Sequence, residues 1–142
     1  MTAVCVSEEA LLHATDRELD RLFRTSPVGE LPAGPADGTA LVAPGSGLTA
    51  NLARLAAWHG VFSPDGQSLV TQLGPVRSME AFVEPGPSWV DARECVVLDY
   101  SGTSLLARGV RGELRRVAPE LCLGVMWLFR RRVGWFLLRM AG

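Results

Sequence analysis

Residues 121–140 have the sequence LCLGVMWLFRRRVGWFLLRM, and this stretch decides the fold. Two apolar segments, 121–129 and 132–140, flank a charged turn at 130–132, whose arginines discourage pairing with other edges. Alternate side chains of a strand point to opposite faces, and here both sets are apolar. One face is therefore expected to line the interior of a barrel. The other needs a cover, either an N-terminal helix or a second copy of the chain.

The period of two extends upstream to about residue 61. Apolar segments recur between proline- and glycine-containing turns, at 67–73, 78–84, 94–100 and 111–118. A short strand is also expected at 38–43, so six or seven strands form an antiparallel meander. The sequence predicts a mainly β fold, an antiparallel lipocalin-like (calycin-type) β-barrel. A barrel of about eight strands is either filled by side chains or holds one small ligand.

Helices are expected only before the strands. Residues 7–24 carry a helical apolar stripe, with Ser7 as its cap and acidic residues in its first turn. Prolines and glycines punctuate 26–47. A short second helix is predicted from Thr49 to Gly60, with Trp58 and His59 at its exit. The chain is then one domain, 1–142, in which an arm at 1–37 precedes a barrel at 38–142.

Charge is distributed unevenly although the net charge is only −1. Residues 1–100 contain 13 acidic residues and 6 arginines, hence −7, whereas residues 101–142 contain 2 acidic residues and 8 arginines, hence +6. The balance disfavours a general nucleic-acid binder. Mutual neutralisation of the two parts is the simpler interpretation, and an acidic partner for the arginine-rich part is the alternative. All 14 basic residues are arginine, a bias typical of a GC-rich genome.

Compartment and cofactors are constrained by what the sequence lacks. The three cysteines, Cys5, Cys95 and Cys122, show no CxxC spacing, which favours a reducing compartment. The first residues do not resemble a secretory signal, and the longest apolar run is too short to span a membrane. We therefore expect a cytoplasmic protein without membrane insertion. With two histidines and no nucleotide or metal motif, no cofactor is expected, although a haem on His59 stays conceivable.

Asp99 and Tyr100 are the first candidate catalytic residues. As neighbours on one strand they must point to opposite faces, so only one of them can face a given cavity. Asp99 would be an acid or base if it were buried beside apolar neighbours, or else it pairs with an arginine or caps the following turn. The Tyr100 hydroxyl could polarise a ligand carbonyl or could belong to a core tyrosine.

Charged and aromatic residues late in the chain supply the remaining candidates. Glu113 and Arg115 share one strand face, where they would orient a polar ligand inside a barrel or form an ion pair outside it, the arrangement that we favour. The predicted ligand-binding residues are Trp58, Met126, Trp127 and Arg115. Large flat side chains suit a cavity for an apolar ligand and suit a plain core equally well.

Three segments resemble a known group of proteins. They are WHGVF at 58–62, LDYSGTS at 98–104 and RGELRRVAPELCLG at 111–124. Together they resemble a family of small, mostly uncharacterised actinobacterial proteins and, distantly, the GXWXG and DUF4334 group. The resemblance covers about residues 38–140 and implies a lipocalin-like barrel.

The sequence also departs from this family at several positions. Relatives are expected to have Lys near Val61, an acid near Gly112 and Arg116, Gly near Glu120 and Tyr near Cys122. If those groups contact a ligand in relatives, this chain binds a different one.

The expected function follows from a barrel without a nucleophile or metal motif. It is a cofactor-independent cyclase or isomerase that holds a hydrophobic polyketide- or terpenoid-like intermediate of bacterial secondary metabolism in the barrel cavity. Asp99 would move the proton, with Tyr100, Glu113 or His59 as alternates. The other interpretations are a non-catalytic carrier of the same ligand class and a homodimeric interaction module.

Overall fold

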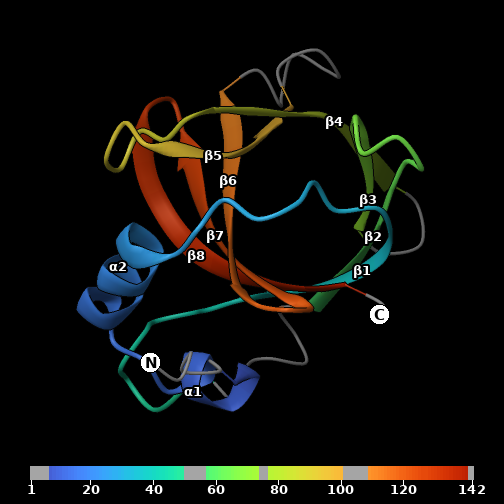
Figure 1. Ribbon diagram of the computed structural model, residues 1–142. Helices are drawn as coiled ribbons and strands as arrows, with labels where there is room; N and C mark the ends of the chain where they lie inside the picture. The colour runs from blue at the N-terminus through green and yellow to red at the C-terminus, as the bar shows by residue number, and fades with distance from the viewer. Residues whose placement is uncertain (1–6, 50–56, 74–76, 101–108, 141–142) are drawn as a thin grey trace.

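The computed structural model describes residues 7–49, 57–73, 77–100 and 109–140. Eight strands form a closed antiparallel barrel in which each strand pairs with the next and β8 pairs with β1 (Figure 1). The strands are β1 Gly34–Ala40, β2 Ala57–Phe62, β3 Ser68–Leu73, β4 Arg77–Pro87, β5 Glu94–Asp99, β6 Val110–Ala118, β7 Leu121–Leu128 and β8 Arg131–Met140. The predicted mainly β antiparallel barrel is confirmed.

The N-terminal helix differs from the prediction because it is broken in two. The helices are α1, Glu8–Leu12, and α2, Asp16–Thr25. Between them the Thr15 hydroxyl accepts a hydrogen bond from the Glu18 amide (3.1 Å), and the Glu18 carboxylate accepts one from the Thr15 amide (3.0 Å). This capping box starts a new helix at Thr15, so the prediction of one helix over 7–24 was wrong.

The segment predicted to end a second helix is a strand. Residues 50–56 lie outside the described residues, but 57–62 form β2, which pairs with β1 and β3. Trp58 packs against the buried cluster inside the barrel, where its ring covers Gly38 of β1. Burial of the inward residues of β2 therefore outweighs the helical spacing of the preceding leucines, and a helix reaching Gly60 was a wrong prediction.

Two turns are placed differently from the prediction. Residues 85–87 continue β4, and the chain reverses at 88–93 instead. Leu128 pairs with Arg131, so the β7–β8 turn consists of Phe129 and Arg130 alone. Both have positive φ, 48° and 66°, as a type I′ hairpin turn requires.

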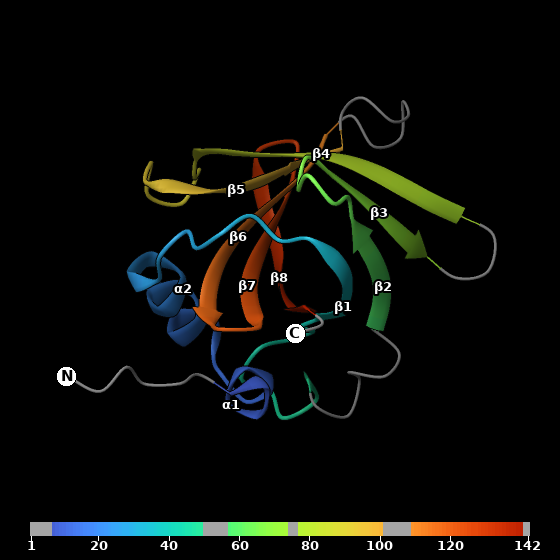
Figure 2. The same ribbon diagram turned by 45° about the vertical axis from the view of Figure 1, so that its right-hand side comes forward.

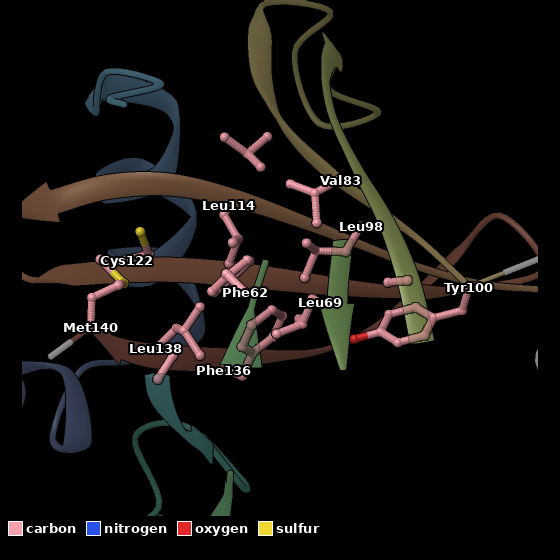
Figure 3. Packing of buried hydrophobic residues seen from close by; sticks show 13 residues of the cluster. Phe62, Leu69, Val83, Leu98, Tyr100, Leu114, Cys122, Phe136, Leu138 and Met140 are labelled. Atoms are coloured by element: carbon pink, nitrogen blue, oxygen red, sulfur yellow. The ribbon is translucent and has the colours of Figure 1, made fainter. Parts of the chain in front are cut away.

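Apolar side chains pack the barrel interior. Figure 3 shows these residues converging from strands on all sides of the barrel. The buried members are Ala36, Phe62, Leu69, Ala81, Val83, Val96, Leu98, Tyr100, Leu114, Cys122, Phe136, Leu138 and Met140. Aromatic rings lie on glycines of the wall, and a Cβ on Gly38 or Gly124 would approach the ring of Trp58 or Phe136 to 2.1 or 2.2 Å. At these positions the interior is filled.

The outer face of β5–β8 is covered by the helices (Figure 2). Leu11 of α1 and Leu19 and Phe23 of α2 are buried in an outer cluster, and Phe23 meets Trp135 edge to face at 6.0 Å. The strand members of this cluster are Cys95, Val97, Leu121, Leu123, Val125, Trp127, Trp135 and Leu137. The N-terminal helices therefore cover the outer apolar face of residues 121–140, which is one of the two covers expected from the sequence.

Candidate functional site

A cavity of about 340 Å³ lies on the outer face of the barrel, where β5 and β6 meet the β7–β8 turn. We call it the Trp89 cavity. It is lined by Trp89, Val97, Asp99, Gly109, Val110, Arg111, Phe129 and Arg130. Apolar and aromatic walls with a few charged groups are typical of a small-molecule site.

A buried carboxylate builds this site. Glu113 of β6 is fully buried and accepts hydrogen bonds from the Ser88 hydroxyl (2.6 Å), the Trp89 amide (2.8 Å) and Nε of Arg111 (3.0 Å). It thereby ties the 88–93 loop to β6 and holds the Arg111 guanidinium. Charge-assisted hydrogen bonds of this kind are strong and directional, so Glu113 positions the cavity wall rather than facing a ligand.

Two guanidinium groups lie over the Trp89 ring. Cζ of Arg111 is 4.3 Å and Cζ of Arg130 is 5.1 Å from the ring centroid, within the range of cation–π attraction. Arg111 also pairs with Glu113 at 3.0 Å, which neutralises its charge. Arg130 is exposed and forms no ion pair with any residue that the structure describes. Of the two arginines that line the cavity, Arg130 is therefore the one without an ion pair among the described residues.

The Trp89 ring is supported by the ring of Trp127. The two rings meet edge to face at 5.5 Å, and 39% of Trp89 remains exposed. Trp127 belongs to the outer cluster, so Trp89 packs against the core on one side and stays partly exposed on the other. Such a supported, half-exposed aromatic ring costs little side-chain entropy when a ligand binds.

Asp99 lies between two cavities on the outer face. In the sheet it is opposite Phe82 of β4 and Arg111 of β6. It lines the Trp89 cavity and a second cavity of about 680 Å³ that extends over β3 and β4. Of the eight predicted site residues, Asp99 is the one that borders these cavities directly.

Tyr100 points into the barrel, on the face opposite to that of Asp99, and strand geometry predicted that the two would lie on opposite faces. Tyr100 is buried in the inner cluster (Figure 3). Burial raises the pKa of its phenol. Asp99 and Tyr100 are therefore on opposite sides of the wall and do not share one site.

Arg115 is fully enclosed by protein acceptors. Its guanidinium binds Asp91 through two nitrogens, at 2.6 and 2.8 Å, and donates to the backbone carbonyls of Phe23, Arg93 and Glu94. All five N–H groups are used, and the residue has no exposed surface. Arg115 thus joins α2 and the 88–93 loop to β6 and has no donor left for a ligand, which argues against the predicted binding role.

Glu113 and Arg115 do not form with each other the ion pair expected from the sequence. Both residues are on the outer face of the barrel wall, as we favoured, but each has another partner, and both are buried under the 88–93 loop. An exposed ion pair contributes little, whereas these two groups hold a loop and a helix in place.

The other predicted residues are dispersed around the barrel. His59 is exposed on the outer face of β2, where its Nδ1 lies 2.8 Å from Oδ1 of Asp37. Trp58 and Met126 pack against the inner cluster, whereas Trp127 belongs to the outer cluster. Trp127 therefore cannot line the barrel interior with the other two. His59, on β2, lies three strands from Asp99 on β5 and four strands from Glu113 on β6.

Sequence reasoning missed Trp89, Arg111, Phe129 and Arg130 as a group. One signal was present, because Arg111 and Glu113 are two residues apart and must share a strand face. Nothing in the sequence placed the 88–93 loop and the β7–β8 turn beside them, since these are tertiary contacts.

The described residues show no other type of site that would identify the protein. They include no group of three or more His, Cys, Asp or Glu side chains that could hold a metal ion. No helix in the described ranges is long and apolar enough to cross a membrane. Comparisons with protein-family models, curated proteins and solved structures give no match. The resemblance to actinobacterial and GXWXG-type barrels therefore stays a prediction. The Trp89 cavity is the feature of the structure that bears on function.

Proposed function

We propose that the protein binds a small hydrophobic molecule that carries an anionic group, and that it does so in the Trp89 cavity. The observation that carries this proposal is the Trp89 ring, half-exposed in an apolar cavity with the guanidinium of Arg130 over it. An apolar ligand can contact the exposed part of the ring while its anionic group meets Arg130. A volume of about 340 Å³ suits a ligand of modest size.

The packed interior supports an outer site. The rings of Trp58 and Phe136 occupy the space above wall glycines, where a lipocalin-like ligand would otherwise lie. Opening that space would require these rings to leave a close-packed core, which costs several kcal/mol in the usual range for large core side chains. We therefore place the hydrophobic ligand outside the barrel, not in the barrel cavity expected from the sequence.

The binding proposal is tested with a matched pair of dyes. Anilinonaphthalene sulfonate is an apolar anion, and phenylnaphthylamine is its neutral counterpart. We expect the anion to bind more tightly, with Arg130→Gln reducing its affinity to that of the neutral dye and Trp89→Leu weakening both. Arg131→Gln, one residue away and outside the cavity lining, serves as the charge control. Equal anion affinity in wild type and Arg130→Gln would refute the proposal.

A cofactor-independent isomerase or cyclase acting on a polyketide- or terpenoid-like molecule is the second candidate. The position of Asp99 between two cavities favours it, because a carboxylate there can reach a ligand in either. In an isomerisation, Asp99 would take a proton from a carbon beside a carbonyl and return it to another carbon of the same molecule. Arg130 would stabilise the intermediate enolate oxygen, and no oxidant is needed.

Proton exchange separates the enzyme from a carrier. β-Tetralone in deuterated water is a suitable probe, because loss of its α-proton signal in NMR spectra reports proton abstraction without a known substrate. An isomerase should accelerate the exchange over the buffer blank, and Asp99→Asn should remove the acceleration while the anionic dye still binds. No acceleration by the wild type would leave only the binding function.

A further inference from the structure

Exposed apolar side chains gather at the β7–β8 turn. Phe129 is 72% exposed, Val133 57% and Leu128 40%, and the half-exposed Trp89 is close by across the Trp89 cavity. The turn lies at the end of the barrel away from α1 in both Figure 1 and Figure 2. We call Leu128, Phe129, Arg130, Arg131 and Val133 the hairpin tip. Apolar residues concentrated at one tip indicate an interaction surface.

The turn residues are poorly suited to their backbone conformation. A two-residue type I′ turn favours Asn-Gly, because both positions need positive φ. Here a phenylalanine and an arginine occupy them, and for such side chains the left-handed region is strained. Departures from local backbone preference are often found where a residue serves function. The strain therefore points to a role for the Phe129 and Arg130 side chains at the surface.

Arginines lie at the tip itself, whereas the carboxylates of Asp99 and Asp16 line the cavities beside Phe129 and Val133. Arg130 and Arg131 are exposed, and within the described part of the chain neither forms an ion pair. Arg132 differs, because it pairs with Asp16 and Asp20 of α2. The tip therefore presents an aromatic ring and two aliphatic side chains beside two guanidinium groups that form no ion pair with a described residue. The partner should be apolar beneath and negatively charged at its surface.

We propose that the hairpin tip docks the protein on an anionic lipid surface. A narrow hairpin can insert Phe129, Leu128 and Val133 below the headgroups of a fluid bilayer while Arg130 and Arg131 meet lipid phosphates. A stable protein partner would need roughly 800 Å² of complementary surface on this side, far more than one turn presents. The inference does not depend on the proposed ligand, although Phe129 and Arg130 also line the Trp89 cavity and would place it at the bilayer.

Vesicle co-sedimentation of the full chain tests this inference. We expect binding to phosphatidylcholine vesicles containing phosphatidylglycerol, little binding to phosphatidylcholine alone, and release by salt. Phe129→Asn should weaken vesicle binding about tenfold through lost apolar burial. The same change should leave the thermal midpoint equal or higher, since Asn accepts positive φ. A loss of vesicle affinity together with retained stability cannot come from unfolding.

Matched controls locate the surface. Phe82→Asn removes a phenylalanine of comparable exposure (57%) from β4 and should leave vesicle binding unchanged. Arg131→Gln should weaken binding about fivefold at low salt. Arg21→Gln, which removes an exposed charge from α2, should not.

Three results would overturn the proposal. They are no binding to mixed vesicles, equal losses for Phe129→Asn and Phe82→Asn, and light scattering that shows a dimer abolished by Phe129→Asn. The last result would identify the partner as a second copy.

Discussion

Removing the Asp91 carboxylate should destabilise this protein far more than removing a surface ion pair. Asp91 is the charged partner of Arg115, which has no exposed surface and is held at 2.6 and 2.8 Å. Breaking a buried pair by removing one partner costs about 3–5 kcal/mol, because the other charge stays buried and uncompensated. Since 11% of the Asp91 side chain is exposed, water can replace part of its contact. We therefore expect about 3 kcal/mol for Asp91→Ala.

A surface pair of similar length provides the control. Nε of Arg24 lies 2.8 Å from Oδ2 of Asp20, but these side chains are 48% and 27% exposed. Arg24→Gln should cost about 0.3–0.5 kcal/mol. Urea denaturation measures both free energies of unfolding, and in thermal melts Asp91→Ala should lower the midpoint by about 6–12 °C. If Asp91→Ala cost no more than Arg24→Gln, the reasoning from burial would be wrong.

The pH dependence of stability provides a second measurement on Asp91. Hydrogen bonds from Arg115 hold the pKa of Asp91 below its ordinary value of 3.8. The folded protein therefore binds this proton less readily than the unfolded chain, so the carboxylate stabilises the fold above the ordinary pKa. That contribution is lost as pH falls through the lower folded pKa. The free energies of unfolding of wild type and Asp91→Asn should differ at neutral pH and converge in acid. A difference that stays constant with pH would contradict the lowered pKa of Asp91.

Three further predictions concern the site and the core. Glu113→Gln should cost about 2 kcal/mol in urea denaturation and abolish dye binding at the Trp89 cavity, and retained dye binding would argue against its positioning role. Gly38→Ala should destabilise by about 2 kcal/mol because its Cβ meets a tryptophan ring, whereas Gly134→Ala, with nothing within 4 Å, should not; equal effects would mean an unfilled interior. Burial raises the pKa of Cys95 to about 12 and of Cys122 to about 11, so with the third cysteine replaced by serine, a thiol reagent at pH 8 should label them only after unfolding.

The barrel could be predicted because its strands carry strong local patterns. The two apolar faces of residues 121–140 indicated both an inner core and an outer cover, and the structure has both. The break at Thr15 was also encoded, since Thr15 and Glu18 have the spacing of a capping box. β2 was misread as the end of a helix because leucines before it have helical spacing, whereas its pairing with β1 and β3 is a long-range effect that no local pattern reports.

The candidate site was less predictable than the fold. The opposite orientations of Asp99 and Tyr100 followed from strand geometry alone. The role of Glu113 did not, because its partners Ser88 and Trp89 come from a loop more than twenty positions earlier in the chain. Trp89 can be recognised as a site residue only when β6 and the β7–β8 turn are known to lie beside it. Closure of the barrel brings these segments together.

The contact between α2 and β8 in the outer cluster affects how the protein folds during synthesis. Phe23 leaves the ribosome early, yet its aromatic partner Trp135 belongs to the last strand, which also closes the barrel by pairing with β1. Neither cluster can be completed until β8 has been made, so folding is expected to be slow and cooperative. Until then, the capping box at Thr15 and Glu18 can keep α2 partly formed. The apolar stripe of α2 becomes buried only when the outer face of the barrel has formed.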